Sequence, residues 1–527
     1  MLLEFWKNPE FVRHLRAELR PVRAITVAAI VVLLCVLLWM SCWSYEQNLL
    51  DNAQRGMATY ATEAWKQRAD YFQEHFAHAT GLLFYRWLVG LQGLGLTFWA
   101  LFSCAQSVSG ERDRKTWEFQ RTTRLTPAEI MIGKLLGEPI LVYYAALCAS
   151  PITLIAGLMG GLSLGAVISV FLVLAITSLF LGLGGMWLST LLESRTRGVG
   201  LIGALALYLF TLGMYGMRES GLPGLAAMSP LTGMIYLLGD AESRIQPVLF
   251  GHEVPWLLMT VLLCGSFSAW LALMLIRNLK RDYPEIRPLS RWQAIGCAAF
   301  LNFLIYALLR PADTVTPSGM FPDAKTVALF AVAINGLILF LMGLATLTPQ
   351  ERLKVWRRKR ANGESALFAD DGLPWPWMGI SAVVAYALMV WGLMAWSHAL
   401  PLDMNTLQSA AVRLLLVLVF VTRDVLFLQW CILTRLKQPI VKGALFLCLY
   451  YVAATVLTVL ARVSSEEAAR WTVSLLTPVL VFDTDVKGLA FPAATYIGLI
   501  LQTGMIGVVL AAIGSRLQRP MQIGAAA

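Results

Sequence analysis

Long apolar segments leave this chain of 527 residues few ways to fold. A helix that crosses the hydrocarbon core of a bilayer needs about 20 mostly apolar residues. Runs of about that length lie at 24–42, 83–105, 139–158, 165–191, 199–216, 256–276, 292–309, 327–347, 376–396, 410–434, 441–461 and 493–514. Only 14% of the residues are charged, whereas a soluble protein has roughly a quarter. We therefore predict an all-α polytopic membrane protein with about 12 transmembrane helices.

The distribution of positive charge supports this number of spans. With the N-terminus inside, 29 of the 42 Lys and Arg residues fall in inner segments, 10 fall in outer loops and the other three lie within spans. Lys and Arg gather in cytoplasmic loops, and one missed span would invert every later loop and blur the bias. We therefore expect both termini to be cytoplasmic. The membrane also accounts for the net charge of +10 better than a nucleic-acid partner does.

The spans divide most simply into two halves of six, residues 1–285 and 286–527. In each half, the loop before the last helix contains a short apolar run that opens with a hydroxyl residue and proline, Ser229-Pro230 and Thr477-Pro478. Both runs are too short to cross a bilayer. Matching placement in two halves is typical of parallel repeats in transporters.

The N-terminal segment is predicted to form an amphipathic helix over residues 3–20. Its apolar residues recur at roughly helical spacing with arginines between them (Phe5, Trp6, Phe11, Val12 and Leu15, with Arg13, Arg16 and Arg20). A basic helix of this kind lies along a membrane surface. We expect it at the cytoplasmic interface.

The segment 109–138 is the longest strongly polar stretch in the first half of the chain, and it reads SGERDRKTWEFQRTTRLTPAEIMIGKLLGE. Thr126 is suited to cap a helix, Pro127 suits the first helical position, and Glu129 completes a capping box. The apolar run that follows leads into the third span. A charged segment with one exposed aromatic residue, Trp117, is thus predicted to be joined stiffly to a transmembrane helix. That arrangement suits a mechanical contact, and the alternative is an ordinary solvated loop.

This segment resembles the signature of ABC-2 type permeases, the membrane subunits of a class of ATP-binding-cassette transporters. The family pattern has an acidic-basic run, Gly-Thr, one residue and Glu, then a Leu-(Ser/Thr)-Pro turn and Gly-Lys at the start of span three. The matching residues are Glu111, Arg112, Asp113, Arg114, Thr116, Glu118, Leu125, Thr126, Pro127, Gly133 and Lys134. Lys115 departs from the pattern because it stands where the family usually has Gly.

The resemblance is strongest in this segment and weaker elsewhere. The N-terminal stretch NPEFVRHLRAELRP resembles the amphipathic helix of such permeases. In the second half, the loop 348–377 occupies the equivalent place between spans eight and nine but lacks the Thr-x-Glu pattern. The second half is therefore expected to be a weaker relative.

The resemblance implies the permease subunit of an ABC transporter in the cell (inner) membrane. Its coupling segment, 109–138, would contact an ABC ATPase subunit through Glu111, Arg112, Arg114, Thr116, Trp117, Glu118 and Lys134. The sequence contains no G-x-x-x-x-G-K-[ST] motif, and before Gly133-Lys134 the first glycine position holds Ala128. We therefore expect a separate polypeptide to use the ATP, and no catalytic residue, cofactor or metal site in this chain.

Three charged residues lie inside the tenth predicted span: Arg413, Arg423 and Asp424. A charge at that depth costs roughly 2.5–3.5 kcal/mol on insertion scales and usually has a partner. Neighbouring residues point about 100° apart on a helix, so Arg423 and Asp424 need not pair with each other. These charges are either a substrate or gating contact or a structural ion pair between helices.

Two other functions remain open at this stage. A membrane-embedded enzyme acting on lipid-linked substrates would usually place an acid-base pair in a large outer loop, and no such pair stands out. An ion-coupled secondary transporter would favour several acidic residues or broken helices at mid-membrane. The expected partners are the ATPase, membrane lipids, and a second copy of this chain or another permease subunit. The sequence does not identify the substrate.

The predicted topology places residue 115 in the cytoplasm, because it follows the second span. Residue 115 should therefore be inaccessible to a membrane-impermeant label in intact cells and become accessible when the cells are opened. Labelling of intact cells at this position would place the segment outside and contradict its coupling role.

Overall fold

The structure is a computed structural model, and it describes residues 6–60, 63–191, 197–219, 222–231, 246–281, 289–308, 324–363, 370, 372–396, 404–434, 439–465, 471–472, 475–477 and 493–518. The chain forms two compact units, Met1–Pro288 and Leu289–Ala527. The predicted boundary between residues 285 and 286 lies outside the described residues. So does most of each short apolar run after Ser229-Pro230 and Thr477-Pro478. The division into two halves of six spans stays a prediction.

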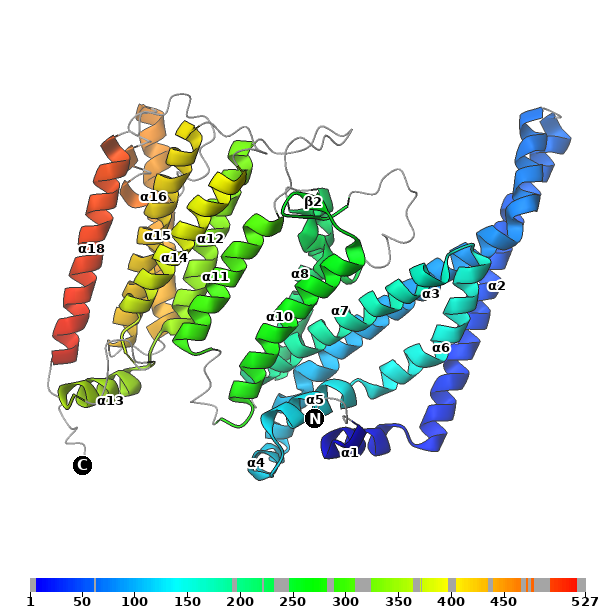
Figure 1. The fold of residues 1–527 in the computed structure, drawn as a ribbon, viewed down its shortest axis with the longest axis horizontal. Helices are drawn as coiled ribbons and strands as arrows, with labels where there is room; N and C mark the ends of the chain where they lie inside the picture. The colour runs from blue at the N-terminus through cyan, green and yellow to red at the C-terminus, as the bar shows by residue number, and fades with distance from the viewer. Residues whose placement is uncertain are drawn as a thin grey trace. The chain divides into compact units, whose positions relative to one another are not determined.

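The first unit is built almost entirely of helices (Figure 1). They are α1 (Pro9–Glu18), α2 (Pro21–Tyr60), α3 (Glu63–Asp113), α4 (Trp117–Thr122), α5 (Pro127–Gly137), α6 (Ile140–Met159), α7 (Leu164–Leu191), α8 (Arg197–Gly213), the 3-10 helices η3 (Met214–Glu219) and η4 (Pro223–Met228), and α10 (Trp256–Asn278). A two-stranded antiparallel hairpin, β1 (Val248–Leu249) and β2 (His252–Glu253), precedes α10. Its turn residues Phe250 and Gly251 both have positive φ, as a tight hairpin turn requires.

The second unit contains only helices among its described residues. They are α11 (Arg291–Leu308), α12 (Ala324–Thr346), α13 (Gln350–Ala361), α14 (Trp375–Trp396), α15 (Met404–Ile432), α16 (Pro439–Ser464) and α18 (Ala493–Gln518). The buried guanidinium of Arg291 ties three of these helices together at one end. It donates to the Thr348 hydroxyl at 2.7 Å and to the Leu373 carbonyl at 2.9 Å, beyond α12 and before α14.

A helix covers each of the apolar segments predicted to span. Within the described ranges, nine helices are long and apolar enough to cross a membrane, or ten if a bent pair at the α12–α13 junction is one span. The apolar part of α8 is shorter, and α15, which carries the three intramembrane charges, is not among the nine. The all-α polytopic class is confirmed. The number twelve and the sides of the termini stay predictions.

Residues 43–82 lie between the first two predicted spans and would therefore be outside the cell, and their described part continues α2 and α3 instead of forming a separate element. At 1.5 Å per residue, the 40 residues of α2 extend about 60 Å, roughly twice the thickness of a hydrocarbon core. Trp39 meets Phe84 edge to face at 5.1 Å, and Trp43 meets Phe76 in the same way at 4.8 Å. Aromatic contacts therefore hold the two long helices side by side at the end of the predicted spans and just beyond it.

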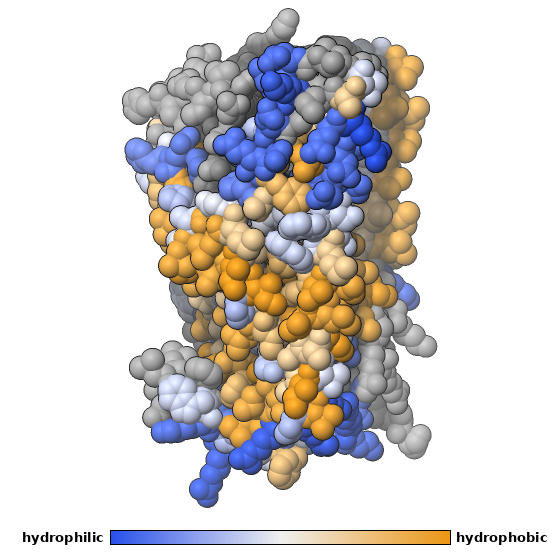
Figure 2. Space-filling model, turned by 90° about the vertical axis from the view of Figure 1, so that its right-hand side faces the viewer, coloured by the Kyte–Doolittle hydropathy of each residue, from blue (hydrophilic) through white to orange (hydrophobic). Residues whose placement is uncertain are grey.

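Apolar side chains face outward on this protein, as lipid requires. Most of the α2 span is exposed in the isolated chain, including Ile25, Leu33 and Met40. On the face drawn in Figure 2, apolar residues form a band between two hydrophilic ends. Helices meet inside through small residues. A Cβ on Gly185 of α7 would overlap the Leu101 carbonyl of α3, so glycine lets these two helices approach closely.

Candidate functional site

α5 begins at a capping box, which confirms the sequence prediction. The Thr126 hydroxyl accepts from the backbone N–H of Glu129 at 3.2 Å, and the Glu129 carboxylate accepts from the backbone N–H of Thr126 at 2.7 Å. These bonds satisfy donors that a helix start leaves unpaired. They fix the start of α5 and therefore the position of Lys134, two turns further along.

Asn8 joins the start of α1 to the start of α5. Its side-chain oxygen caps α1 by accepting from the backbone N–H of Glu10 at 3.0 Å. Its side-chain nitrogen donates to the carbonyl of Glu129 at 2.7 Å. One side chain therefore caps one helix and fastens it to the first turn of another.

Two glycines on α5 form the surface on which α1 rests. A Cβ at Gly133 would lie 2.6 Å from the Cβ of Glu10, and a Cβ at Gly137 would lie 2.8 Å from the Cβ of His14. Real Cβ atoms do not come that close. The pairs 133 and 137, and 10 and 14, are each one helical turn apart, so the two helices meet along matched faces.

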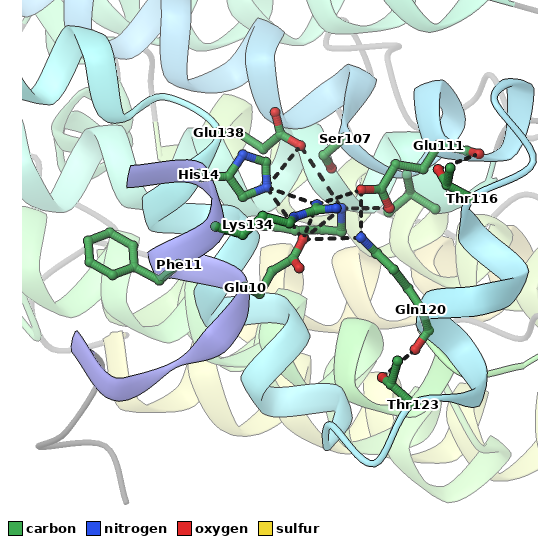
Figure 3. A network of polar contacts seen from close by, with 12 residues as sticks. Glu10, Phe11, His14, Ser107, Glu111, Thr116, Gln120, Thr123, Lys134 and Glu138 are labelled. Carbon is green, nitrogen blue, oxygen red and sulfur yellow. Dashed lines mark hydrogen bonds and ion pairs between the residues drawn. The ribbon is translucent and has the colours of Figure 1, made fainter. Parts of the chain in front are cut away.

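Lys134 lies at the centre of a buried group of charges (Figure 3). Its side chain is 0% exposed, and its ammonium lies 2.8 Å from the carboxylate of Glu111 and 3.5 Å from that of Glu10. The contact with Glu111 is an ion pair whose angles fall outside hydrogen-bond geometry. We call the following residues the Lys134 cluster: Glu10, Arg13, His14, Glu111, Gln120, Lys134 and Glu138.

Arg13 and Gln120 complete the bridging between α1, α3 and α4. The Arg13 guanidinium lies 2.6 Å from Glu10 and 2.9 Å from Glu111. The Gln120 amide donates to Glu111 at 2.8 Å and to Glu10 at 3.3 Å. The carboxylates of Glu10 on α1 and Glu111 on α3 thus share two donors, from α1 and α4, and the Lys134 cation of α5, so that four helices meet here.

The charges within the cluster balance closely. Three carboxylates face the cations Lys134 and Arg13, and His14 adds a third positive charge when protonated, 3.4 Å from Glu10 and 3.8 Å from Glu138. Burial alone would raise the pKa of Glu10, but the hydrogen bond with His14 and the charges of Lys134 and Arg13 outweigh it and lower the pKa to about 2. Glu10 is therefore ionised at neutral pH. Burial raises the pKa of Glu138, where the opposing charges are weaker.

The structure separates the predicted coupling residues into buried and exposed groups. Glu111 and Lys134 are inside the cluster, and the Arg112 guanidinium donates to the Thr190 carbonyl on α7 at 3.1 Å. Arg114, Thr116 and Glu118 are exposed. The Glu118 carboxylate pairs with Arg121 at 2.9 Å and remains 68% exposed.

The prediction that Trp117 is an exposed aromatic residue is wrong. Its side chain is 2% exposed and packs with Val108, Ile130 and Met131, and the Lys134 ammonium lies 5.8 Å from its ring centroid. Trp117 and Gln120 are three residues apart on α4 and share its buried side. The exposed aromatic residue is Phe119, at 77%.

Lys115 lies at a bend of the backbone, at the position where the family pattern usually has glycine. Its φ is +58°, in the left-handed region. Glycine takes this conformation without a steric penalty, whereas an L side chain loses roughly 1–2 kcal/mol. The lysine at this position therefore adds a positive charge and local strain to the bend between α3 and α4.

Sequence reasoning missed the contribution of α1 to the site. Glu10, Arg13 and His14 belong to a helix that was expected only to lie on a membrane surface, and Gln120 and Glu138 were not assigned to any cluster. The available signal was the equal spacing of Glu10 and His14 with Gly133 and Gly137. α1 begins at Pro9, after its cap Asn8, and ends at Glu18, so it is shorter than the predicted helix 3–20, of which residues 3–5 lie outside the described structure. Its place at an interface stays a prediction.

A polar cavity of about 630 Å³ adjoins the cluster. Its lining includes charges of both signs, among them Arg13, Glu18, Arg114 and Glu138, and the hydroxyl of Ser107. The cavity leaves part of the cluster within reach of water, while Lys134 itself is closed off.

The comparison with known families gave a match that lies within the first unit. Residues 26–242 match the family model described as ABC-2 type transporter. This part of the chain is an ABC-2 type transporter membrane domain. The match confirms the resemblance found in the sequence and, together with the apolar helices, supports a multi-pass membrane protein with an ABC-2 type membrane domain. Neither the curated proteins nor the solved structures gave a significant match.

The match covers only part of the site. The ABC-2 domain includes α3, α4 and α5, which supply Glu111, Gln120 and Lys134, but α1 lies before its first matched residue. The second unit lies beyond its last one, so the relationship of that unit to the family stays a prediction.

The predicted intramembrane charges of the second unit form a separate polar network. Arg423 pairs with Asp424 at 2.6 Å and donates to the Gln502 carbonyl oxygen of α18 at 2.7 Å. The Tyr451 hydroxyl of α16 donates to Asp424, and that of Tyr450 accepts from Arg423 at 3.2 Å. These contacts join three helices, which favours a structural ion pair between helices over a substrate or gating contact. Arg413 lies ten residues earlier on α15 and is partly buried.

The close approach of α1 to α5 predicts opposite effects for two glycine substitutions. Gly133→Ala should separate the helices and lower the free energy of unfolding by about 1–3 kcal/mol, since overpacking strains the contact. Gly110→Ala, on α3, is the control, because a Cβ there meets nothing within 4 Å and alanine favours a helix by about 1 kcal/mol. Thermal unfolding of the purified protein measures both. Equal melting temperatures would show that α1 does not rest on Gly133.

The Arg423 network predicts that Asp424→Ala destabilises the protein and that a second substitution restores much of the lost stability. Asp424→Ala leaves Arg423 with one fewer partner in a buried site, which costs about 3–5 kcal/mol. Adding Arg423→Met should recover much of the folded yield in detergent, because no charge is then left unpaired. A double variant that folds but fails in transport, once a substrate is known, would instead support a substrate or gating role.

Proposed function

We propose that this chain is the permease subunit of an ABC transporter in the cell (inner) membrane. The chain supplies the transmembrane path, and a separate ABC ATPase subunit hydrolyses the ATP. The ABC-2 domain match supports the permease class. The finer proposal is that α4, on the cytoplasmic side, receives the movement of the ATPase.

The exposed side of α4 is suited to contact a soluble partner. Phe119 is 77% exposed, and Arg114, Lys115, Glu118 and Arg124 surround it in the sequence and are exposed as well. A single aromatic residue within a charged rim is the usual composition of an interface hot spot. Phe119, which the sequence analysis did not select, is the proposed anchor.

The buried side of α4 is suited to transmit a displacement to the neighbouring helices. The Lys134 cluster connects α4 with α1, α3 and α5, and only Glu138 and Pro139 separate α5 from α6. On another side, the Lys280 ammonium donates to the Thr123 carbonyl at 3.0 Å, which ties the turn after α4 to the end of α10. A displacement of α4 would therefore move several transmembrane helices together. This buried linkage is the observation on which the proposal depends.

The signature residues have two roles under this proposal. Arg114, Thr116 and Glu118 meet the ATPase, while Glu111, Trp117 and Lys134 hold α4 in place from inside. The two alternatives, an enzyme for lipid-linked substrates and an ion-coupled transporter, are less favoured because the family match is to a transporter of the ATP-driven class. A second copy or another permease subunit remains a proposed partner, and the substrate is open.

The contact role of Phe119 predicts a specific loss of ATPase binding. Phe119→Ala should weaken binding of the proposed ABC ATPase subunit, to be sought among the products of neighbouring genes, by about 30-fold, the equivalent of about 2 kcal/mol. Copurification and stimulation of ATP hydrolysis in nanodiscs measure the effect. Tyr71→Ala is the matched control, because Tyr71 is a 59% exposed aromatic residue on the part of α3 expected outside the cell.

Glu111→Ala is a poor test of contact, because it leaves Lys134 buried without its nearest carboxylate and acts through folding. If Phe119→Ala and Tyr71→Ala bind the ATPase equally well, α4 is not the contact. If no ABC ATPase copurifies with the wild-type chain, the proposed function itself is wrong.

A further inference from the structure

α13 in the second unit is a short helix that crosses the ends of its neighbours. It is bent by 74° from the last part of α12, Val332–Thr346, and lies across the ends of α15 and α18 in Figure 1. Leu353 is 0% exposed and Trp356 4%. Both pack against the end of α15 and the last turns of α18, through Leu426, Leu433 and Ile513.

The rest of α13 is strongly basic. Its sequence, QERLKVWRRKRA, holds four arginines and two lysines against one glutamate. Arg357, Arg358, Lys359 and Arg360 are all exposed. At 100° per residue, Arg357, Lys359 and Arg360 lie beside the buried Leu353 and Trp356, whereas Arg358 lies on the opposite side of the helix. The Arg360 guanidinium also lies 5.2 Å from the Trp356 ring centroid.

The position of this charge points to lipid headgroups. A helix nearly perpendicular to a spanning helix runs along the membrane surface, and Trp356 at its buried edge is typical of that level. α18, on which α13 rests, exposes apolar side chains as a lipid-facing helix does: Ile500 is 72% exposed and Val508 is 69% exposed. Arginine and lysine stems reach along apolar surface and place their charges among phosphates.

We propose that α13 binds anionic phospholipids of the cytoplasmic leaflet through Arg357, Lys359 and Arg360. The cytoplasmic leaflet carries the acidic headgroups, and residues 348–375 belong to a segment expected inside. The inference is independent of ATPase coupling, because it concerns the second unit alone. It also gives the loop equivalent to the coupling segment a different partner from that segment.

Lipid retention tests the proposal directly. The full-length protein is equilibrated with equal amounts of phosphatidylglycerol and phosphatidylcholine, and the copurifying lipids are counted by native mass spectrometry. The variant Arg357→Gln, Lys359→Gln, Arg360→Gln should reduce phosphatidylglycerol retention at least tenfold and leave phosphatidylcholine unchanged. The charge-matched control is Arg114→Gln, Lys115→Gln, Arg124→Gln in the first unit, which should retain phosphatidylglycerol as the wild type does.

Two further measurements keep the result interpretable. Retention by the wild type should fall when salt is raised from 0.1 to 0.5 M, because the Debye length shrinks; this needs no variant to fold. Equal loss in both triple variants, no loss in either, or salt-independent retention would each overturn the proposal. Loss of ATPase binding without loss of phosphatidylglycerol in the α13 variant would also overturn it, and would make α13 a protein contact.

Discussion

The buried ammonium of Lys134 is the constraint on which the site depends. A cation with 0% exposure loses its water, and that loss is tolerated only where carboxylates replace the water. Glu111 comes from α3 and Glu10 from α1, so neutralising one charge on α5 requires two other helices to be in place. Gln120 and Trp117 then bring α4 to the same point. The electrostatics of one side chain thus explain why four separate elements meet at one point, and the same contacts hold α4 in the position that the proposed coupling role requires.

The same constraint gives the family signature a physical meaning. Gly-Lys at the start of the third span combines a residue without a side chain, which admits α1, with the cation that α1 helps to neutralise. The Thr-Pro pair before it sets the start of α5 through the capping box. The position before Thr116 adopts a left-handed backbone, which accounts for the usual glycine there and for the penalty that Lys115 carries. Most residues of the signature therefore assemble the site, and only its exposed residues can contact a partner.

The sequence was sufficient for features set by local spacing. Apolar runs placed helices at every predicted span, and the hydroxyl-proline-glutamate pattern located the start of α5. It was insufficient where residues distant in the chain meet. Glu10 and Glu111 are separated by about a hundred residues, and no periodicity links them. Trp117 was misread because charged neighbours on both sides suggest a surface, while the side of α4 that it occupies is decided by α5. Arg423 and Asp424 were found from their depth alone, but their partners on α16 and α18 required the fold.

The two units differ in what neutralises the charged residues between their predicted spans. In the first, the charges between spans two and three are largely neutralised within the protein, and the small exposed remainder surrounds Phe119. In the second, α13 concentrates six cations beside a single carboxylate on the same helix. Mutual repulsion of that size destabilises a helix unless anions lie close by. An acidic membrane surface supplies such anions continuously, whereas a protein partner would supply them only when bound. Under the two proposals, the first unit is moved through α4, and the charge on α13 keeps the second unit fixed at the membrane surface.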